Sequence, residues 1–268
     1  MIIDSHVHIF PDSIAPKAVA SLARHAPHPM ASDGTLGGLL SSMAKGGINK
    51  SVILPVSTKP EQVPGINCYA LRLNQNPGII AFGALHPDFA NFRDEIKRLK
   101  DSGIQGVKMH PDYQAFDADE KRLLPLYEAL AKAGLILYLH AGENVNIKEK
   151  PRCTPEKLAN IVNTLPQLKL IAAHLGGWSM WDDVERRLIG TPIFLDTSFT
   201  LGYINADQFL RIIRAHGVDK IIFGSDFPWN DPGEAAQAIR VLPLSDEEKK
   251  LILGKNAARL LSLPMAPS

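Results

Sequence analysis

The chain has 268 residues and a mass of 29.3 kDa, which is enough to bury a sizeable core in one or two domains. Hydrophobic residues make up 45% and charged residues 21%, an ordinary globular composition that excludes a disordered or fibrous chain. The 29 Lys and Arg nearly balance the 28 Asp and Glu, so the formal net charge is +1. Without an excess of basic side chains, nucleic acid is a poor candidate for the main partner.

The cysteines and the apolar runs indicate the compartment. Cys68 and Cys153 are too few for a disulfide framework and too far apart in the sequence for the usual thiolate metal motif. The first residues, Met-Ile-Ile-Asp-Ser-His, lack the basic and long apolar regions of a signal peptide. The longest apolar runs, such as Leu135–Leu139, are far too short to span a bilayer. The sequence therefore predicts reduced thiols and a soluble cytoplasmic protein without a membrane partner.

Short apolar and β-branched runs recur along the chain and alternate with longer amphipathic stretches. Each run is nearly continuous in its apolar residues, which is typical of parallel strands buried on both faces. The predicted strands are Ile2–Ile9, Ser51–Val56, Ile79–Leu85, Ile104–Met109, Leu135–His140, Lys169–His174, Ile193–Asp196 and Lys220–Gly224.

The amphipathic stretches carry the start and stop signals of helices. Lys121–Ala133 places its apolar residues on one face and is followed by Gly134, a residue typical of helix ends. Thr154 is the predicted N-cap of Glu156–Leu165, with a proline between them at the first helical position. Ser245 precedes acidic residues that favour the first turn of a C-terminal helix. The other predicted helices are Glu61–Asn76, Phe92–Ser102 and Ala206–His216, and Ala15–Pro29 is predicted as a loop with a short helix.

The alternation of strands and helices predicts the fold. Eight such units in a chain of this length favour a closed α/β barrel, the (β/α)8 TIM barrel, in a single domain over residues 1–268. An open doubly wound sheet is the alternative. No Gly-x-Gly-x-x-Gly follows the first predicted strand, which argues against a dinucleotide-binding version of that sheet. No linker or low-complexity segment divides the chain.

Six of the nine histidines lie at or just beyond the end of a predicted strand, and an aspartate closes the last one. In a barrel these strand ends meet on one face, where active sites are built. His6 and His8 are two residues apart on a strand, so their side chains emerge on the same face, where two imidazoles can bind one metal ion. A single such histidine is best explained as a hydrogen-bonded core residue, but a whole layer of them is not. The residues at strand ends are His6, His8, His86, His110, His140, His174 and Asp226, whereas His25, His28 and His216 lie in loops or at a helix end.

Together with their flanking residues, these positions resemble a known family. The motifs are His6-Val7-His8, Lys108-Met109-His110-Pro111, His140-Ala-Gly, His174-Leu-Gly-Gly and Gly-Ser-Asp226-Phe-Pro, in this order on predicted strands 1, 4, 5, 6 and 8. They resemble the amidohydrolase superfamily and are most similar to its amidohydrolase-related group (amidohydrolase 2). That group of metal-dependent TIM-barrel proteins also contains the aminocarboxymuconate semialdehyde decarboxylase-like enzymes. The resemblance is specific for the superfamily and for the metallo-dependent hydrolase type of barrel, but not for the substrate.

The resemblance implies a metal centre and its chemistry. It implies that His6, His8, His140 and Asp226 bind one divalent metal ion, most often zinc, and that His174 stands beside the activated water. A divalent ion lowers the pKa of bound water towards about 7. Asp226 can orient that water and accept its proton, and His174 can stabilise the developing negative charge. Manganese, iron and cobalt are compatible with the same ligand types.

Lys108 leaves three interpretations open. In several amidohydrolases a lysine on the fourth strand is carboxylated and bridges two metal ions, and His174 would then bind the second ion. The amidohydrolase-related group often keeps Lys-x-His-Pro with a single ion, so we favour one ion with Lys108 as a substrate-binding or supporting residue. A lysine that pairs with a carboxylate across the barrel is the third interpretation. We also assign substrate binding to His110, although a structural role explains both His110 and His86 equally well.

The leading hypothesis is a metal-dependent hydrolase in which activated water attacks an amide, lactone or ester-like carbon of a small organic substrate. The alternative is a metal-dependent non-oxidative decarboxylase of a small carboxylic acid, and a ligand-binding barrel without chemistry is the third candidate. Most loops are short, so we expect a second copy of the chain to help close the pocket in a homo-oligomer. Aromatic residues that follow the strand ends would supply the apolar walls of the pocket: Tyr113, Phe116, Trp178, Trp181 and Trp229.

Overall fold

The computed structural model describes residues 1–24, 29–145, 147 and 149–264. His25 and His28, and part of the predicted segment Ala15–Pro29, lie outside these residues. Among the described residues, no helix combines the length and the apolar character needed to cross a membrane. The chain forms two compact units. We call them the terminal unit, Met1–Ile53 with Asp196–Ser268, and the central unit, Leu54–Leu195.

Two parallel strands open the terminal unit. β1 (Ile3–Val7) is buried along its whole length and pairs with β2 (Lys50–Ile53). On its other side, the backbone N–H of Ser5 donates to the carbonyl of Phe223 at 2.8 Å, directly after β9 (Ile221–Ile222). The residues that follow β9 therefore run alongside β1, although 218 positions separate Ser5 from Phe223.

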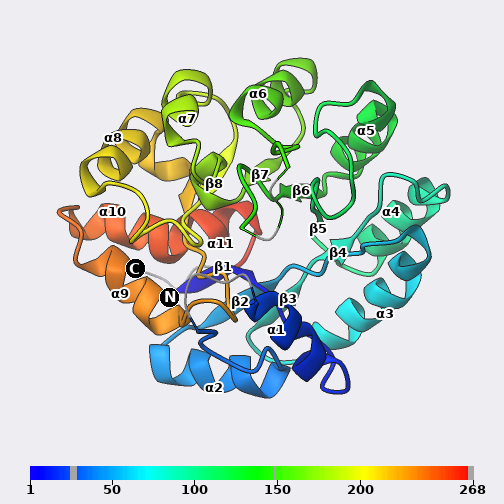
Figure 1. The fold of residues 1–268 in the computed structure, drawn as a ribbon, viewed down its shortest axis with the longest axis horizontal. Helices are drawn as coiled ribbons and strands as arrows, with labels where there is room; N and C mark the ends of the chain where they lie inside the picture. Colours follow the sequence, from blue (N-terminus) through cyan, green and yellow to red (C-terminus); the bar gives the residue numbers. More distant parts are fainter. Residues whose placement is uncertain (25–28, 146, 148, 265–268) are drawn as a thin grey trace. The chain divides into compact units, whose positions relative to one another are not determined.

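Helices surround these strands in the terminal unit (Figure 1). Helices α2 and α9 pack so closely that a Cβ built on Gly46 would lie 2.7 Å from the Cα of Gly233. Glycine is required at this crossing because any side chain would separate the two backbones. The helices are α1 (Ala15–Ala23), α2 (Leu36–Gly46), α8 (Ala206–His216), α9 (Pro232–Arg240), α10 (Asp246–Lys250) and α11 (Asn256–Leu260), with a π-helical turn at Leu251–Lys255 and a 3₁₀ turn at Val218–Lys220.

The central unit contains a run of parallel strands that follow one another in chain order. β5, β6 and β7 are buried at every residue, as expected for a parallel sheet covered on both faces. Their register pairs Lys108 with Tyr138 and Met109 with Leu139, so the ends of β5 and β6 are level. The strands are β3 (Ile79–Ala81), β4 (Gly83–Ala84), β5 (Gly106–Met109), β6 (Ile136–Leu139), β7 (Leu170–Ala172) and β8 (Phe194–Asp196), which ends where the chain returns to the terminal unit.

The helices of the central unit lie along one side of this run of strands (Figure 1). Gly134 ends α5 with a φ of 70°, and the Thr154 hydroxyl accepts the N–H of Lys157 at 3.3 Å, so both predicted signals are confirmed. The helices are α3 (Val63–Leu73), α4 (Phe92–Asp101), α5 (Leu124–Ala133), α6 (Pro155–Thr164) and α7 (Trp181–Arg187), and 3₁₀ turns at Pro60–Gln62 and Lys121–Leu123 precede α3 and α5.

Every predicted strand overlaps an observed strand, with differences at the boundaries. The predicted strand Ile79–Leu85 is divided into β3 and β4. The predicted strand Lys169–His174 ends early, at Ala172, and His174 opens a 3₁₀ turn with a φ of 57°. Helices α2, α7 and α9 were not predicted, because α7 has seven residues and α2 and α9 have glycines in their first turns. Tertiary packing stabilises such helices against a glycine penalty of about 1 kcal/mol per residue.

Candidate metal centre

Three of the predicted metal ligands converge in the terminal unit at the end of β1. The Nε2 atoms of His6 and His8 are 3.0 Å apart. An Asp226 oxygen, Oδ1, lies 3.4 Å from Nε2 of His6 and 3.5 Å from Nε2 of His8. Ligand atoms bound at about 2.1 Å from one ion are separated by roughly 3.0–3.4 Å in octahedral or tetrahedral coordination. The three observed separations are close to this range, so these side chains fit one divalent ion.

The backbone explains why these three side chains meet. His6 lies in β1 and His8 follows its last residue, and their Nε2 atoms meet, so the two side chains emerge on the same face, as predicted. Asp226 comes from the segment after β9, where its N–H donates to the carbonyl of His6 at 2.9 Å and the N–H of His8 donates to the carbonyl of Phe227 at 2.7 Å. Asp226 has a φ of 67°, a left-handed conformation. A non-glycine residue in this conformation lowers the stability of the fold by on the order of 1–3 kcal/mol. The backbone hydrogen bonds on both sides hold Asp226 in this conformation.

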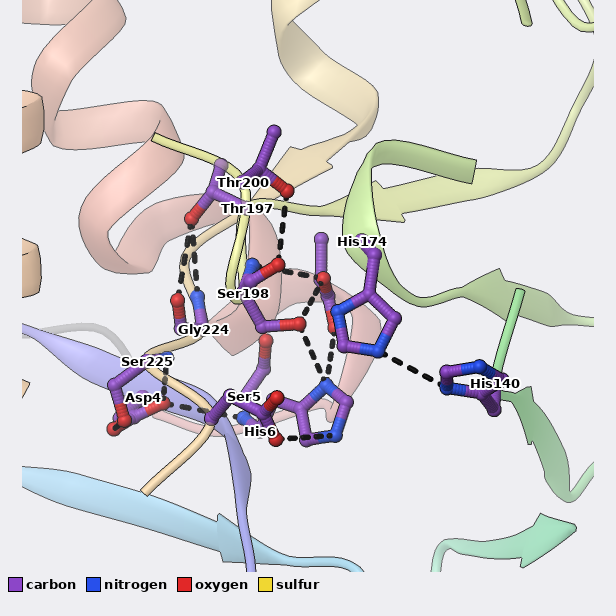
Figure 2. A network of polar contacts seen from close by, with 12 residues as sticks. Asp4, Ser5, His6, His140, His174, Thr197, Ser198, Thr200, Gly224 and Ser225 are labelled. Atoms are coloured by element: carbon purple, nitrogen blue, oxygen red, sulfur yellow. Dashed lines mark hydrogen bonds and ion pairs between the residues drawn. The ribbon is translucent and has the colours of Figure 1, made fainter. Parts of the chain in front are cut away.

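The other nitrogen of His6 is bound by a buried carboxylate. Nδ1 of His6 lies 2.7 Å from Oδ2 of Asp196, which is fully buried, and 2.9 Å from the hydroxyl of Ser198. Figure 2 shows Ser198 beside the His6 ring. A carboxylate accepts hydrogen bonds, so Nδ1 carries the hydrogen and Nε2 keeps its lone pair for an ion. Metal-binding histidines in proteins usually have such a partner, and this arrangement is a second sign that the site fits a metal.

The sequence did not identify Asp196 or Ser198 as functional residues. The Ser198 hydroxyl and N–H donate to Oδ1 of Asp196 at 2.7 and 2.9 Å, so Ser198 holds the carboxylate that holds His6. Asp196 closes a predicted strand, which is the same signal that identified Asp226. That signal was available in the sequence, whereas the contact across 190 positions was not.

Asp4 connects β1 to the segment that carries Asp226. Its carboxylate accepts the N–H of Ser225 at 2.9 Å, the hydroxyl of Ser225 at 2.5 Å and the N–H of His6 at 3.2 Å. Burial raises the pKa of Asp4 to about 7, although these hydrogen bonds act in the opposite direction. Figure 2 shows Ser225 bonded to Asp4. Asp4 therefore joins the backbone of His6 to the residue that precedes Asp226, and it is not one of the three candidate ligands.

The other candidate histidines lie in the central unit, where the structure also brings them together. Nε2 of His174 lies 3.1 Å from Nδ1 of His140, and the two rings are nearly perpendicular (Figure 2). The ring of His110 stacks on His140 with 4.1 Å between centroids. Oδ2 of Asp112 lies 3.5 Å from Nε2 of His140. Burial raises the pKa of Asp112, and a hydrogen bond from the backbone of Arg152 offsets part of this rise.

Lys108 is buried beside an aromatic ring of the central unit. Its Nζ lies 4.7 Å from the centroid of the Tyr138 ring, and the two residues are register partners on β5 and β6. A cation is attracted to the face of an aromatic ring, whereas the anion formed by carboxylation of a lysine is not. The contact is therefore compatible with the ammonium form of Lys108.

Gln114 ties together three segments that follow strands in the central unit. Its side-chain carbonyl accepts the N–H of His110 at 2.8 Å, and its amide donates to the carbonyls of Ser57 at 2.7 Å and Leu85 at 2.6 Å. No sequence motif pointed to Gln114. His86 is buried next to Leu85, and its Nδ1 accepts the N–H of Asp88 at 3.2 Å, a contact that fits a structural role.

Three of the predicted aromatic wall residues contact histidines, and a fourth packs in the core. Tyr113 stacks on His110 with 4.0 Å between centroids. Trp181 donates from its indole to the carbonyl of His174 at 3.2 Å, and Trp229 meets the ring of His8 edge-on at 5.7 Å. Phe116 is fully buried and belongs to the core.

The predicted site residues thus form two groups in the structure. The terminal unit holds the candidate metal centre, and the central unit holds the cluster around His140. The assignment of His140 as the fourth ligand, and the roles of His174, Lys108 and His110, stay predictions.

Comparison with solved structures identifies the fold. The 5-carboxyvanillate decarboxylase of Sphingomonas paucimobilis is similar over 98% of this chain and 99% of its own, with a TM-score of 0.77 and 16% identity. A dihydroxybenzoic acid decarboxylase of Polaromonas sp. JS666, with bound manganese and an inhibitor, has a TM-score of 0.73 and 17% identity, covering 99% of this chain and 98% of its own. A Pseudomonas putida protein described as a 2-pyrone-4,6-dicarboxylic acid hydrolase has a TM-score of 0.70 and 19% identity, over 99% and 98%. These likenesses show an α/β TIM barrel of the metallo-dependent hydrolase type, as predicted.

Comparison by sequence agrees with the predicted resemblance. The family model described as Amidohydrolase matches residues 3–263. A 2-amino-3-carboxymuconate-6-semialdehyde decarboxylase of Dictyostelium discoideum is 22% identical over 206 residues, which are 63% of this chain and 56% of the relative. A dihydroorotase of Pseudoalteromonas atlantica is 29% identical over 92 residues, 31% of this chain and 26% of the relative. The match therefore spans about a quarter of one curated relative and about half of the other.

Proposed function

We propose that this chain, which belongs to the amidohydrolase family, is an enzyme that decarboxylates a small aromatic carboxylic acid without oxidation. The observation that carries the proposal is the group His6, His8 and Asp226, which fits one divalent ion in a fold whose similar structures include several decarboxylases. One of these, a 2,6-dihydroxybenzoate decarboxylase, was solved with its aromatic acid. These neighbours favour the decarboxylase, which the sequence supported as the alternative, over the leading hypothesis of a hydrolase.

We assign one divalent ion to His6, His8 and Asp226, and we keep His140 as the fourth ligand that the family resemblance implies. The short separations of the first three support this assignment, and the family resemblance supports the fourth. When bound, the ion supplies positive charge that stabilises negative charge on substrate oxygens. Manganese is bound by a similar decarboxylase, and this ligand set also suits the zinc that the resemblance implied.

The side chains of this protein then perform the proton and charge steps. Decarboxylation breaks the bond between the ring carbon and the carboxylate, releases CO₂ and places a proton on the same carbon. Asp226 is suited to hold and deliver this proton, because a carboxyl group can both bind and release it. We assign to His174, as the resemblance implies, the donation of a hydrogen bond to developing negative charge. Lys108, as an ammonium, and His110 are assigned to binding the substrate acid.

Hydrolysis of a lactone is the second candidate, favoured by the similarity to the Pseudomonas putida protein. In this reaction Asp226 would orient a water molecule and accept its proton as the water attacks the ester carbon. The same ligand group serves both reactions. The two reactions therefore differ in their substrates and in whether the oxygen of water enters the product.

Isotope labelling of the products tests the proposal. The purified protein, loaded with Mn²⁺ or Zn²⁺, is incubated with a panel of hydroxybenzoates and 2-pyrone carboxylates in D₂O, and in parallel in H₂¹⁸O. Decarboxylation is expected to release CO₂ and leave one deuterium on the ring, without ¹⁸O in the ring product. Ring-opened acids that carry ¹⁸O, formed without release of CO₂, would instead establish the hydrolase.

The remaining expectations from the sequence complete the proposal. We expect a single domain over residues 1–268, a homo-oligomer and a cytoplasmic location, as argued from the sequence. Mass measurement in solution tests the oligomer, and the intact mass of the native protein tests whether Lys108 is carboxylated. An added carboxyl group on Lys108 would contradict the single-ion site favoured here.

A further inference from the structure

Residues of the central unit restrain the imidazole of His140 on three sides. Nε2 of His174 lies 3.1 Å from its Nδ1, and His110 stacks on its face with an angle of 10° between the rings. Oδ2 of Asp112 lies 3.5 Å from its Nε2, and the side chains of His140 and Asp112 are only 10% and 3% exposed. Stacking fixes the plane of the ring but not the position of its hydrogen. The contact with His174 does not determine the position of this hydrogen either, because a neutral imidazole can donate or accept.

The two oxygens of Asp112 have different surroundings. Oδ1 accepts the backbone N–H of Arg152 at 3.0 Å, which joins the segment after β5 to the segment after β6. Oδ2 is buried and has no hydrogen-bond partner within the described part of the chain. Its separation from Nε2 of His140 is roughly 0.5 Å longer than an ordinary hydrogen bond, so a small movement completes the contact. Oδ2 of Asp112 is therefore positioned to accept a hydrogen bond from the His140 ring.

The turn that carries Asp112 is also the turn that carries His110. Nδ1 of His110 accepts the N–H of Tyr113 at 3.4 Å, and its carbonyl accepts the N–H of Gln114 at 3.0 Å. A single turn thus presents a ring to the face of His140 and a carboxylate to its edge. Such a turn limits both the plane and the rotation of the His140 ring.

The terminal unit contains the same pairing of a histidine with a buried carboxylate. There Asp196 holds Nδ1 of His6 and leaves Nε2 of His6 directed at the candidate metal centre. We propose that Asp112 is a positioning residue that accepts the N–H of Nε2 of His140 and keeps the lone pair on Nδ1. Without an ion, Nδ1 can then accept from His174, and its lone pair is the one available to a cation. The effect of Asp112 on catalysis rests on the proposed function, whereas its effect on the His140 ring does not.

The substitution Asp112→Asn separates the two roles of this side chain. Asparagine keeps a carbonyl for the N–H of Arg152 and replaces Oδ2 by an amide group, which cannot accept from His140. Histidine tautomers are read from long-range proton–nitrogen correlation spectra of protein labelled with ¹⁵N-histidine, with His140 assigned from a His140→Gln sample. We expect the Nε2–H tautomer of His140 in the original protein and a shift towards the Nδ1–H tautomer in the variant.

Matched variants decide whether the effect is specific. Asp117→Asn removes a carboxylate of the same segment, one that pairs with Lys157, and is expected to leave the His140 tautomer unchanged. Asp112→Glu retains a carboxylate and is expected to retain the Nε2–H tautomer, at least in part. An unchanged tautomer in Asp112→Asn, or the same shift in Asp117→Asn, would overturn the proposal.

Binding of Mn²⁺ to the metal-free protein, followed by calorimetry, connects the positioning role to the proposed function. We expect Asp112→Asn to bind Mn²⁺ about 10- to 100-fold more weakly, with partial recovery in Asp112→Glu. A tautomer shift combined with unchanged Mn²⁺ affinity would support the positioning role and contradict the assignment of His140 as a ligand. Unchanged spectra combined with normal Mn²⁺ binding would overturn the positioning role and leave the proposed function standing.

Discussion

Asp196 accepts a hydrogen bond from Nδ1 of His6 at 2.7 Å, and both side chains are buried. The contact joins residues 190 positions apart and determines which His6 nitrogen faces His8 and Asp226. Because a neutral imidazole has one hydrogen, the carboxylate binds it at Nδ1 and leaves the lone pair of Nε2 available to an ion. The candidate metal centre of the terminal unit therefore depends on Asp196, which is not one of its three candidate ligands.

Replacement of Asp196 by asparagine is expected to weaken the metal site. We expect Asp196→Asn to bind Mn²⁺ or Zn²⁺ about 10- to 100-fold more weakly than the original protein, because the amide no longer fixes the His6 tautomer. Calorimetric titration of protein freed of metal by a chelator measures the change. Asp207→Asn, an exposed carboxylate of the same unit, serves as the control and is expected to bind normally. Equal affinity in all three proteins would show that Asp196 has no part in the site.

The variant Asp226→Asn is expected to keep the fold of the protein but to lose its activity. Asparagine adopts the left-handed conformation that Asp226 has at a φ of 67°, so Asp226→Asn should unfold within a few degrees of the original protein. Asp226→Ala should lose roughly 1 kcal/mol more, because alanine is strained there. Both variants should lose about 10²- to 10⁴-fold in turnover, since neither carries the proton. Thermal unfolding and turnover on the same samples make the comparison, and full activity in Asp226→Asn would rule out the proposed role.

Glu95 is expected to make the stability of the central unit depend on pH. Burial raises the pKa of Glu95, but hydrogen bonds from Arg98 and Asn67 outweigh it and hold the pKa below 4.5. A carboxyl group with a lowered pKa in the folded state stabilises the protein above its unfolded pKa, and this contribution disappears as the pH falls through the folded pKa. Glu95→Gln should therefore cost about 1 kcal/mol at pH 7 and progressively less below pH 4.5.

Urea unfolding at several pH values between 3 and 8 measures this difference. Lys97→Gln is a suitable control, because Lys97 pairs with an exposed aspartate one turn away on the same helix and its loss should change little. A constant difference between Glu95→Gln and the original protein over this pH range would contradict the expected linkage.

Gln114 is expected to stabilise the central unit well beyond an average surface residue. Gln114→Leu leaves the carbonyls of Ser57 and Leu85 and the N–H of His110 without their partner. Buried groups without partners should together lower the free energy of unfolding by about 2–4 kcal/mol. Chemical unfolding measures the loss, and Gln75→Leu, at an exposed position, is expected to change it by less than about 0.5 kcal/mol. A loss of similar size in both variants would refute the role of the Gln114 bonds.

Signals within a few residues were enough to predict much of the fold. The apolar runs located the strands, and Thr154 and Gly134 marked a helix start and a helix end that the structure confirms. Helices α2 and α9 escaped prediction because the glycines in their first turns oppose helix formation locally, while close packing of the two helices at Gly46 and Gly233 favours it. Packing of this kind involves residues far apart in the sequence, so it cannot be predicted from local sequence patterns.

The sequence by itself determined the residue types of the candidate site and their positions at strand ends, because hydrophobic periodicity and motif spacing are local properties. It therefore identified His6, His8, His140, His174 and Asp226, and it also supported the resemblance to the family. Tertiary structure alone decided that Asp196 partners His6, that Asp112 faces His140 and that Gln114 joins three segments. A hydrogen bond requires atoms within about 3 Å of each other, and only the folded chain brings such distant residues to that distance.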